Sequence, residues 1–343
     1  MKSMAYNGFP MLLINSKSIL IKIHNRATNN PDILKEGNPH LLIVLLLILA
    51  GLLFASCGEN SSAFHDREVK KTEISTLTPT EKQTDNVRIA LAVTDISVGS
   101  NRLRFGLIAK GEGPVKNAPV SLHTYYLDGE RPNQKVESLE TTYIEWPTGK
   151  GGVYTATANF TQKGRWGLGV VLGSGDNARR ASAFIEVSDT SMAPSIGTAV
   201  PRSITKSLSQ GHPIKSITSD SNPYPPLYEL TLREALDSAL PSLVAFATSA
   251  YCRTATCGPQ LEIIKNLHKS HRDRINFIHI EIYDNPNDIK GDLSKGIISS
   301  AAKEWNLPSE PWTFLINSEG VVIERYEGLV TSREILDILP YLR

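Results

Sequence analysis

Two cysteines, Cys252 and Cys257, stand close together in the chain, and they are the residues best suited to chemistry. The third cysteine, Cys57, lies far upstream at the end of an apolar run. Two thiols can close a disulfide, and a thiolate can attack a disulfide in another molecule. One pair is too few for a four-ligand structural zinc site or a disulfide scaffold. The pair is therefore either a working redox site or a structural disulfide of an oxidising compartment.

The sequence around the pair predicts a strand on one side and a helix on the other. The apolar run over 242–248, SLVAFAT, is typical of a buried parallel strand. Gly258 and Pro259 open an apolar period over 261–267, which predicts an amphipathic helix with proline in its first turn. Cys257 would then lie at the helix N-terminus, where the helix dipole and unpaired N–H groups favour a thiolate.

The remaining patterns of the C-terminal region alternate between strand and helix. A helical spacing over 230–240 precedes the first strand. The later elements are a strand over 275–283, a helix over 297–305, strands over 312–316 and 321–326, and a helix over 332–342. From residue 242 onward the predicted order is therefore β, α, β, α, β, β, α.

This order, with cysteines between the first strand and the first helix, resembles thioredoxin. Cys257, Gly258 and Pro259 match the first three positions of the C-G-P-C motif, and Pro311 matches the cis-proline before the next strand. The turn over 317–320 matches the family's hairpin. The pattern FATSAYCRTATCGP followed by EPWTFLIN also resembles a group of thioredoxin-like envelope proteins. We therefore expect an α/β thioredoxin fold over 229–343.

The resemblance implies a role for each residue of the site. Cys257 would be the attacking thiolate and Cys252 the thiol that resolves the mixed disulfide. A cis-proline at Pro311 would leave neighbouring backbone free to pair with an extended substrate. Arg253 would either add positive charge near the pair or be a solvated surface residue.

Three residues depart from the thioredoxin pattern. Gln260 occupies the place of the second cysteine, so Cys252 is the one candidate partner for Cys257. Ala245 stands where thioredoxin carries a buried aspartate that moves protons. Glu310 precedes the proline, where a carboxylate would raise the thiol pKa or select basic substrates.

The N-terminal segment, residues 1–57, reads as a signal peptide or membrane anchor. The apolar run over 41–56 is shorter than the ~20 residues of a spanning helix and suits a secretory signal. Its end at Cys57 resembles a bacterial lipobox, which implies cleavage before Cys57 and lipid on its sulfur; an uncleaved anchor is the alternative. Basic residues precede the run, so both readings place the rest of the chain outside the cytoplasm. Residues 58–85 read as a flexible tether.

Residues 86–189 alternate apolar and polar side chains in short runs separated by glycine-rich turns. This pattern predicts a β-sandwich, and it resembles immunoglobulin-like domains of bacterial envelope proteins. Residues 190–228 are rich in proline and serine and form either a linker or an extended segment lying on the next domain.

Composition sets limits on function. With 41% hydrophobic residues, 21% charged residues and a net charge of +1, nothing argues for nucleic acid. Copper chaperones of the Sco type pair closer cysteines with a downstream histidine, whereas His268, His271 and His279 fall on a predicted helix and strand. We expect no cofactor and no metal site.

The sequence therefore predicts a membrane-anchored, extracytoplasmic thioredoxin-like lipoprotein, lipid-anchored at the bacterial cell membrane. As a thiol–disulfide oxidoreductase it would act on thiols and disulfides of envelope proteins together with a redox partner. The alternative is a non-catalytic envelope binding module in which Cys252–Cys257 is structural. The two differ in reduction potential, since a structural bond lies below about −300 mV.

Overall fold

The structure, a computed structural model, describes residues 86–147, 149 and 151–342. The predicted signal segment with Cys57 and the predicted tether lie outside the described residues. No helix within the described part of the chain is long and apolar enough to cross a membrane. The described residues all belong to one compact unit.

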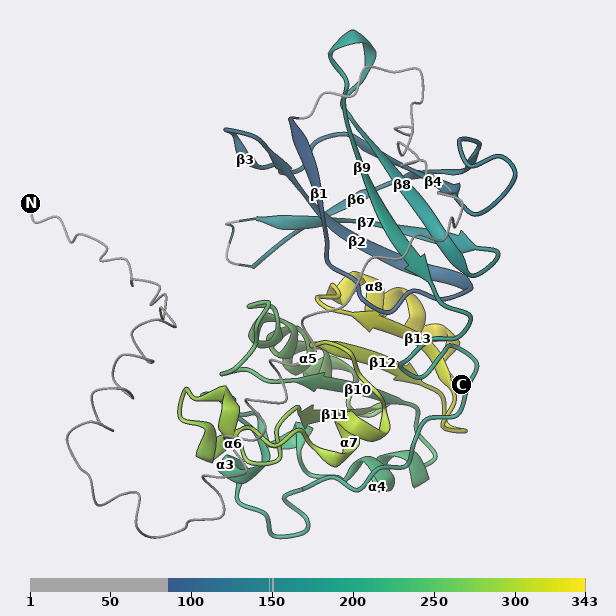
Figure 1. The fold of residues 1–343 in the computed structure, drawn as a ribbon. Coiled ribbons are helices and arrows are strands. Elements are labelled where there is room, and N and C mark those ends of the chain that lie inside the picture. Colours follow the sequence, from purple (N-terminus) through teal and green to yellow (C-terminus); the bar gives the residue numbers. More distant parts are fainter. Residues whose placement is uncertain (1–85, 148, 150, 343) are drawn as a thin grey trace, which may run out of the picture. The chain divides into compact units, whose positions relative to one another are not determined.

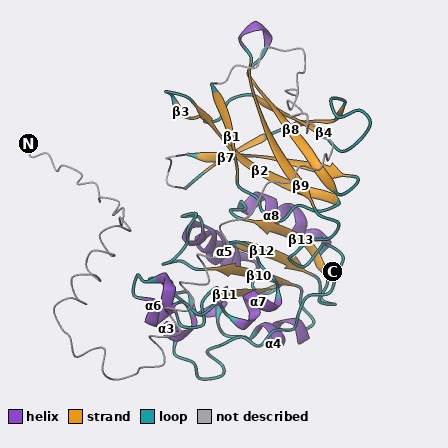
Figure 2. Ribbon diagram, viewed as in Figure 1, coloured by secondary structure: helices purple, strands orange, loops and turns teal. Residues whose placement is uncertain are grey.

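The first part of the described chain is a β-sandwich, as the alternating pattern predicted (Figures 1 and 2). One sheet has the order β1-β2-β7-β6 with β3 beside β2, and the other has the order β5-β4-β8-β9. The strands are β1 Val87–Leu91, β2 Gly99–Ala109, β3 Gly113–Pro114, β4 Val120–Tyr126, β5 Lys135–Glu140, β6 Thr142–Glu145, β7 Gly152–Phe160, β8 Gly164–Leu172 and β9 Arg179–Val187.

The core between the two sheets is built from the inward-facing half of each strand. Its largest fully buried members are Phe105, Tyr154, Phe160 and Trp166. Strand β5 has a weak apolar pattern, because four of its six residues are exposed. The alternation that places aromatic rings on one face is therefore what specifies this domain.

The second part is an α/β domain that resembles the thioredoxin fold. Its sheet has the order β11-β10-β12-β13, in which β10 and β11 are parallel and the other pairs are antiparallel. The elements are α3 Ile214–Ile217, α4 Leu232–Asp237, β10 Ser242–Ala247, α5 Cys257–His271, β11 Asn276–Glu281, α6 Pro286–Ile289, α7 Ser300–Glu304, β12 Trp312–Ile316, β13 Val322–Glu327 and α8 Ser332–Ile338. The predicted order from residue 242 onward is confirmed, with α6 added.

Apolar side chains cover both faces of this sheet. Helices α5 and α8 pack on the face that carries Leu243, Ala245 and Ala247 of β10, and α4 and α7 pack on the opposite face. All six residues of β10 are buried, as expected for a central strand. This packing fixes where β10 ends and where α5 begins.

The proline-rich segment after the sandwich lies on the α/β domain. Ala199 forms a bridge with Val321, and the backbone N–H of Val200 donates to Gly320. Leu227 and Tyr228 are buried in the core beside α5. The segment therefore packs on the α/β domain rather than hanging free.

The two domains contact each other through β13 and the loop that follows it. Arg104 of β2 is buried and donates to the backbone oxygen of Glu327, 2.7 Å away. Asp95, before β2, pairs with Arg325 at 2.9 Å. Arg102 pairs with Glu334 at 2.7 Å. These charged contacts tie the sandwich to the edge strand β13 and to helix α8.

An apolar cluster lies beside these ion pairs. Ile144 and Val153 of the sandwich are buried against Leu329, and Ile263 of α5 packs on the same cluster. The sandwich therefore also contacts the helix that begins at Cys257.

Gly328 is required at this contact for two reasons. Its φ of +73° favours glycine, and a Cβ there would collide with the Arg104 guanidinium. We expect Gly328→Ala to cost the left-handed strain of about 1–2 kcal/mol and, in addition, about 1.5–3 kcal/mol for the displaced hydrogen bonds of a charged group. Urea unfolding measures both.

The matched control is Gly175→Ala. Gly175 has a φ of +65°, and an added Cβ would meet open space, so Gly175→Ala costs the backbone strain alone. Equal losses in the two variants would show that Arg104 contributes nothing at this contact.

Candidate redox site

Cys252 and Cys257 form a disulfide at the carboxyl edge of the thioredoxin-like sheet. Their Cα atoms are 5.9 Å apart, within the usual range for a disulfide. Strand β10 ends at Ala247, and α5 begins at Cys257 itself. The four residues between the cysteines therefore fold back, as the sequence required of the pair.

The two sulfurs differ in their surroundings. The Cys257 residue is fully buried in the core beside α5, with 0% exposure, whereas Cys252 is only partly buried. The backbone N–H of Cys257 donates to the Cys252 sulfur at 3.2 Å. Because this N–H belongs to the first residue of a 15-residue helix, it would stabilise negative charge on Cys252.

The cysteine loop, residues 252–257, is held by local contacts. The Thr254 hydroxyl lies 3.4 Å from the Cys252 sulfur and 2.8 Å from the Thr256 hydroxyl. Ala255 has a φ of +58°, an unusual conformation for a residue with a side chain. Arg253 is exposed. The loop thus leaves Cys252 partly exposed and Cys257 buried in the core.

The proline strap, residues 309–312, lies against this loop. The Glu310–Pro311 peptide bond is cis, in keeping with the thioredoxin resemblance. One Glu310 carboxylate oxygen accepts the backbone N–H of Arg253 at 3.3 Å, and the Glu310 backbone oxygen lies 3.5 Å from the Thr254 hydroxyl. The structure therefore brings Pro311 and the cysteine pair into one site.

Burial raises the pKa of the Glu310 carboxyl, and the N–H and charge of Arg253 act in the opposite direction. A carboxyl with a raised pKa therefore contacts the cysteine loop from the strap. Glu310 departs from the thioredoxin pattern in the sequence, and in the structure its carboxylate contacts the N–H of Arg253.

Gln260 is buried at the place of the missing second cysteine. Its side-chain oxygen accepts the backbone N–H of Val330 at 2.8 Å, which ties α5 to the loop before α8. Gln260 thus makes a structural hydrogen bond at this position, and it has no thiol for disulfide exchange.

The sequence did not associate two ionisable residues of β11 with the sheet face on which Cys257 is buried. Ala245 pairs in register with His279, and Ala247 pairs with Glu281, so both side chains share the sheet face on which Cys257 is buried. Burial raises the pKa of Glu281, which accepts the backbone N–H of Ser219. The alternation in residues 275–283, INFIHIEIY, already indicates that His279 and Glu281 share one face of the strand.

His279 has a structural explanation. Burial lowers its pKa to about 4, so the ring is neutral at ordinary pH. Its Nδ1 lies 2.8 Å from the Tyr228 hydroxyl and its Nε2 lies 3.2 Å from the Ala247 oxygen. Both nitrogens are thus occupied. Within the described residues no group of three or more His, Cys, Asp or Glu side chains is placed to hold a metal.

Comparison with known proteins adds a family match for part of the chain. Residues 81–171 match the family model described as YtkA-like, which covers most of the β-sandwich. No curated protein matches the chain.

Several solved structures are similar to parts of this chain at low identity. A Chlorobium tepidum structure named as a thiol:disulfide interchange protein DsbE is 11% identical, covers 43% of this chain and 97% of its own, and has a TM-score of 0.31. A thio-disulfide isomerase from Thermus thermophilus is 16% identical, with 43% and 96% covered and a TM-score of 0.26. A DUF4426 family protein from Pseudomonas aeruginosa is 13% identical, with 27% and 68% covered and a TM-score of 0.20.

The unequal burial of the sulfurs predicts unequal reactivity. After reduction, we expect a bulky maleimide to label Cys252 at least about tenfold faster than Cys257, since thiol reactivity requires access. Peptide mass spectrometry after brief exposure separates the two sites. Equal labelling rates in the folded protein would contradict the burial difference.

Glu310 predicts a pH dependence of stability. Its raised pKa means that the folded protein binds this proton more tightly than the unfolded chain, so the stabilisation is present at low pH and is lost as pH rises through the folded pKa. Relative to Glu310→Gln, the wild-type protein should therefore lose stability as pH rises from 4 to 7.

Urea unfolding across this range measures the effect. Glu229→Gln, at an exposed position, is the control for removal of one charge. A stability difference between wild type and Glu310→Gln that does not change with pH would refute the burial effect at Glu310.

Proposed function

We propose that this chain is a thiol–disulfide oxidoreductase with Cys252 as the attacking sulfur and Cys257 as the resolving sulfur. One observation carries the proposal: the sulfur of the partly exposed Cys252 accepts the N–H of the first residue of α5 and is bonded to a buried partner. The sequence suggested the opposite order, from the match of Cys257 to the first cysteine of C-G-P-C. Exposure favours Cys252, because an incoming disulfide must reach the attacking sulfur.

The chemistry is a pair of exchange steps. The Cys252 thiolate attacks a substrate disulfide, forms a mixed disulfide and expels one substrate thiolate, which takes up a proton. Cys257 then gives up its proton and attacks the Cys252 sulfur, which expels the second substrate thiolate. The substrate gains two electrons and two protons, and the chain holds the Cys252–Cys257 disulfide. A partner dithiol returns the pair to its reduced form, and the reverse sequence oxidises a substrate.

The proline strap supports substrate binding in this scheme. Pro311 lies beside the cysteine loop through Glu310, so an extended substrate would lie along the strap while its sulfur meets Cys252. Glu310 would then favour substrates with basic residues near the disulfide.

We further propose that the protein acts outside the cytoplasm, anchored at the bacterial cell membrane by lipid on Cys57. The lipobox-like end of the apolar run and the basic residues before it support this placement. Thiols and disulfides of envelope proteins are then the substrates within reach.

A structural disulfide is the competing candidate. The full burial of Cys257 and the many contacts of the cysteine loop favour it. Such a bond would resist thiols unless the protein unfolds, and its reduction potential would lie below about −300 mV.

Mixed-disulfide trapping tests the proposal and the order of the sulfurs. The full chain carrying Cys57→Ser has the pair as its remaining cysteines. In that background we expect Cys257→Ser to accumulate a mixed disulfide with a disulfide-bonded model peptide, because Cys252 attacks and nothing resolves. Cys252→Ser should trap at least about tenfold less.

Non-reducing electrophoresis and mass spectrometry measure the adduct. Trapping by Cys252→Ser alone would restore the order suggested by the sequence. A native pair that stays oxidised in excess dithiothreitol and opens only in urea would overturn the enzyme and leave the structural disulfide.

A further inference from the structure

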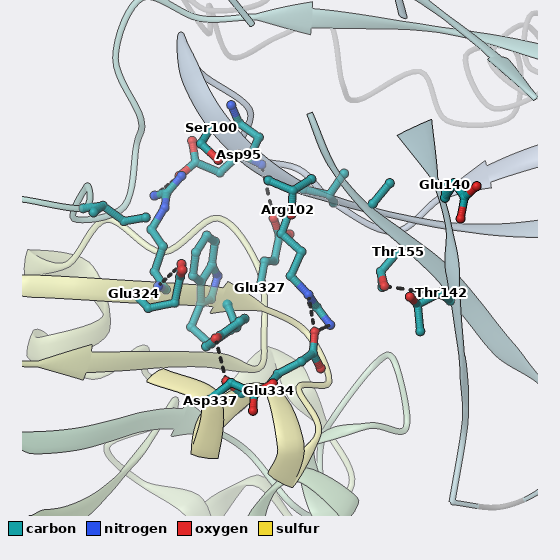
Figure 3. A pocket seen from close by; sticks show the side chains of 18 residues that line it. Asp95, Ser100, Arg102, Glu140, Thr142, Thr155, Glu324, Glu327, Glu334 and Asp337 are labelled. Carbon is teal, nitrogen blue, oxygen red and sulfur yellow. Dashed lines mark hydrogen bonds and ion pairs between the residues drawn. The ribbon is translucent and has the colours of Figure 1, made fainter. Parts of the chain in front are cut away.

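The β-sandwich makes its polar contacts with the α/β domain beside the proline strap. A polar pocket of about 400 Å³ lies between the domains, lined by residues of β2 and β7 on one side and by β13 and α8 on the other (Figure 3). Neither cysteine lines this pocket. Glu327 stands at its wall, and Figure 3 shows Arg102 pointing toward Glu334 across it.

Glu327 connects the sandwich directly to the strap. It is the last residue of β13 and pairs in register with Trp312, the first residue of β12. Its carboxylate accepts the Thr94 N–H at 2.9 Å and the Thr94 hydroxyl at 2.7 Å, both from the sandwich. The same carboxylate accepts the Ser309 hydroxyl of the strap at 2.6 Å.

The strap is fastened on both sides of its proline. Ser309 also accepts the indole N–H of Trp312 at 3.2 Å. The N–H of Gly328 donates to the backbone oxygen of Pro311 at 2.6 Å, and Arg104 holds the neighbouring Glu327 oxygen. Thus the side chain and the backbone of Glu327 both connect sandwich residues to the strap.

We propose that the β-sandwich is the positioning domain of the redox site, with Thr94, Arg104 and Glu327 as positioning residues that hold the proline strap against the cysteine loop. From the strap, Glu310 contacts the N–H of Arg253 within the loop. This contact is made with the loop closed by the disulfide. In this proposal the strap stabilises this closed loop more than the open loop of the dithiol, so that a loosened strap shifts the balance toward the dithiol. The inference rests on the proposed function for its redox consequence.

The balance is measured by equilibrating the full chain with glutathione. Two glutathione thiols reduce the protein disulfide and leave as glutathione disulfide, so electrons and protons balance. We expect Glu327→Gln and Thr94→Val each to shift this equilibrium toward the dithiol by about three- to tenfold, which is about 15 to 30 mV for a two-electron couple.

Two variants separate positioning from mere stability. Arg102→Gln removes the ion pair with Glu334 at the same domain contact, and the hydrogen bonds of Arg102 go to Glu334 and Leu329 rather than to the strap. Asp128→Asn removes a carboxylate that accepts the backbone N–H and the side-chain Nε–H of Arg165, both within the sandwich. Both should leave the glutathione equilibrium within about twofold of wild type, whatever stability they lose. A shift by either variant as large as that of Glu327→Gln would overturn the positioning role.

Hydrogen exchange gives a readout that needs no redox activity. In the oxidised protein, Glu327→Gln should speed exchange of the Arg253 amide at least about threefold, because its acceptor Glu310 moves with the strap. Unchanged exchange and an unchanged equilibrium would refute the inference. A wild-type pair that glutathione cannot reduce, together with faster exchange in the variant, would refute the proposed enzyme and leave the positioning role standing.

Discussion

The burial of β10 is the constraint on which the rest of the site depends. This strand is paired on both sides and covered on both faces, so the chain leaves it at a fixed point on the edge of the sheet. Helix α5 must then return across the face that carries Ala245 and Ala247. The short connection between them has to lie at the edge, and that connection contains both cysteines. A disulfide here can therefore place one sulfur under the helix and leave the other near solvent.

Much of the fold follows from local sequence pattern. The alternation of strands and helices after residue 242 is visible because buried strands and amphipathic helices have different apolar periods. Strand β5 shows little pattern because most of its side chains are exposed. Helix α6 was missed because a single turn has too few residues to show a period. The one local signal for α6 is Pro286 at its first position, where proline is favoured in helices.

The site was predictable in its members but not in their arrangement. Spacing and motif identified Cys252, Cys257, Pro311 and Glu310. Which sulfur is buried depends on how a four-residue loop folds on the core, and no pattern within those residues encodes that. The contacts of Glu327 lie more than 200 positions from Thr94 along the chain, so only tertiary packing reveals them.

Those loop residues have a consequence for how such a protein can change over evolutionary time. Arg253, Thr254 and Ala255 are exposed and belong to no strand or helix, whereas the sulfurs they separate are set by the sheet and by α5. Substitutions in the loop can thus alter the ease of opening the sulfur–sulfur bond without disturbing the core. In a C-x-x-C site the intervening residues lie in the helix itself, and every change there also affects helix stability. With Cys252 upstream of α5, substitutions between the two cysteines can change the reduction potential of the disulfide without changing the stability of the helix.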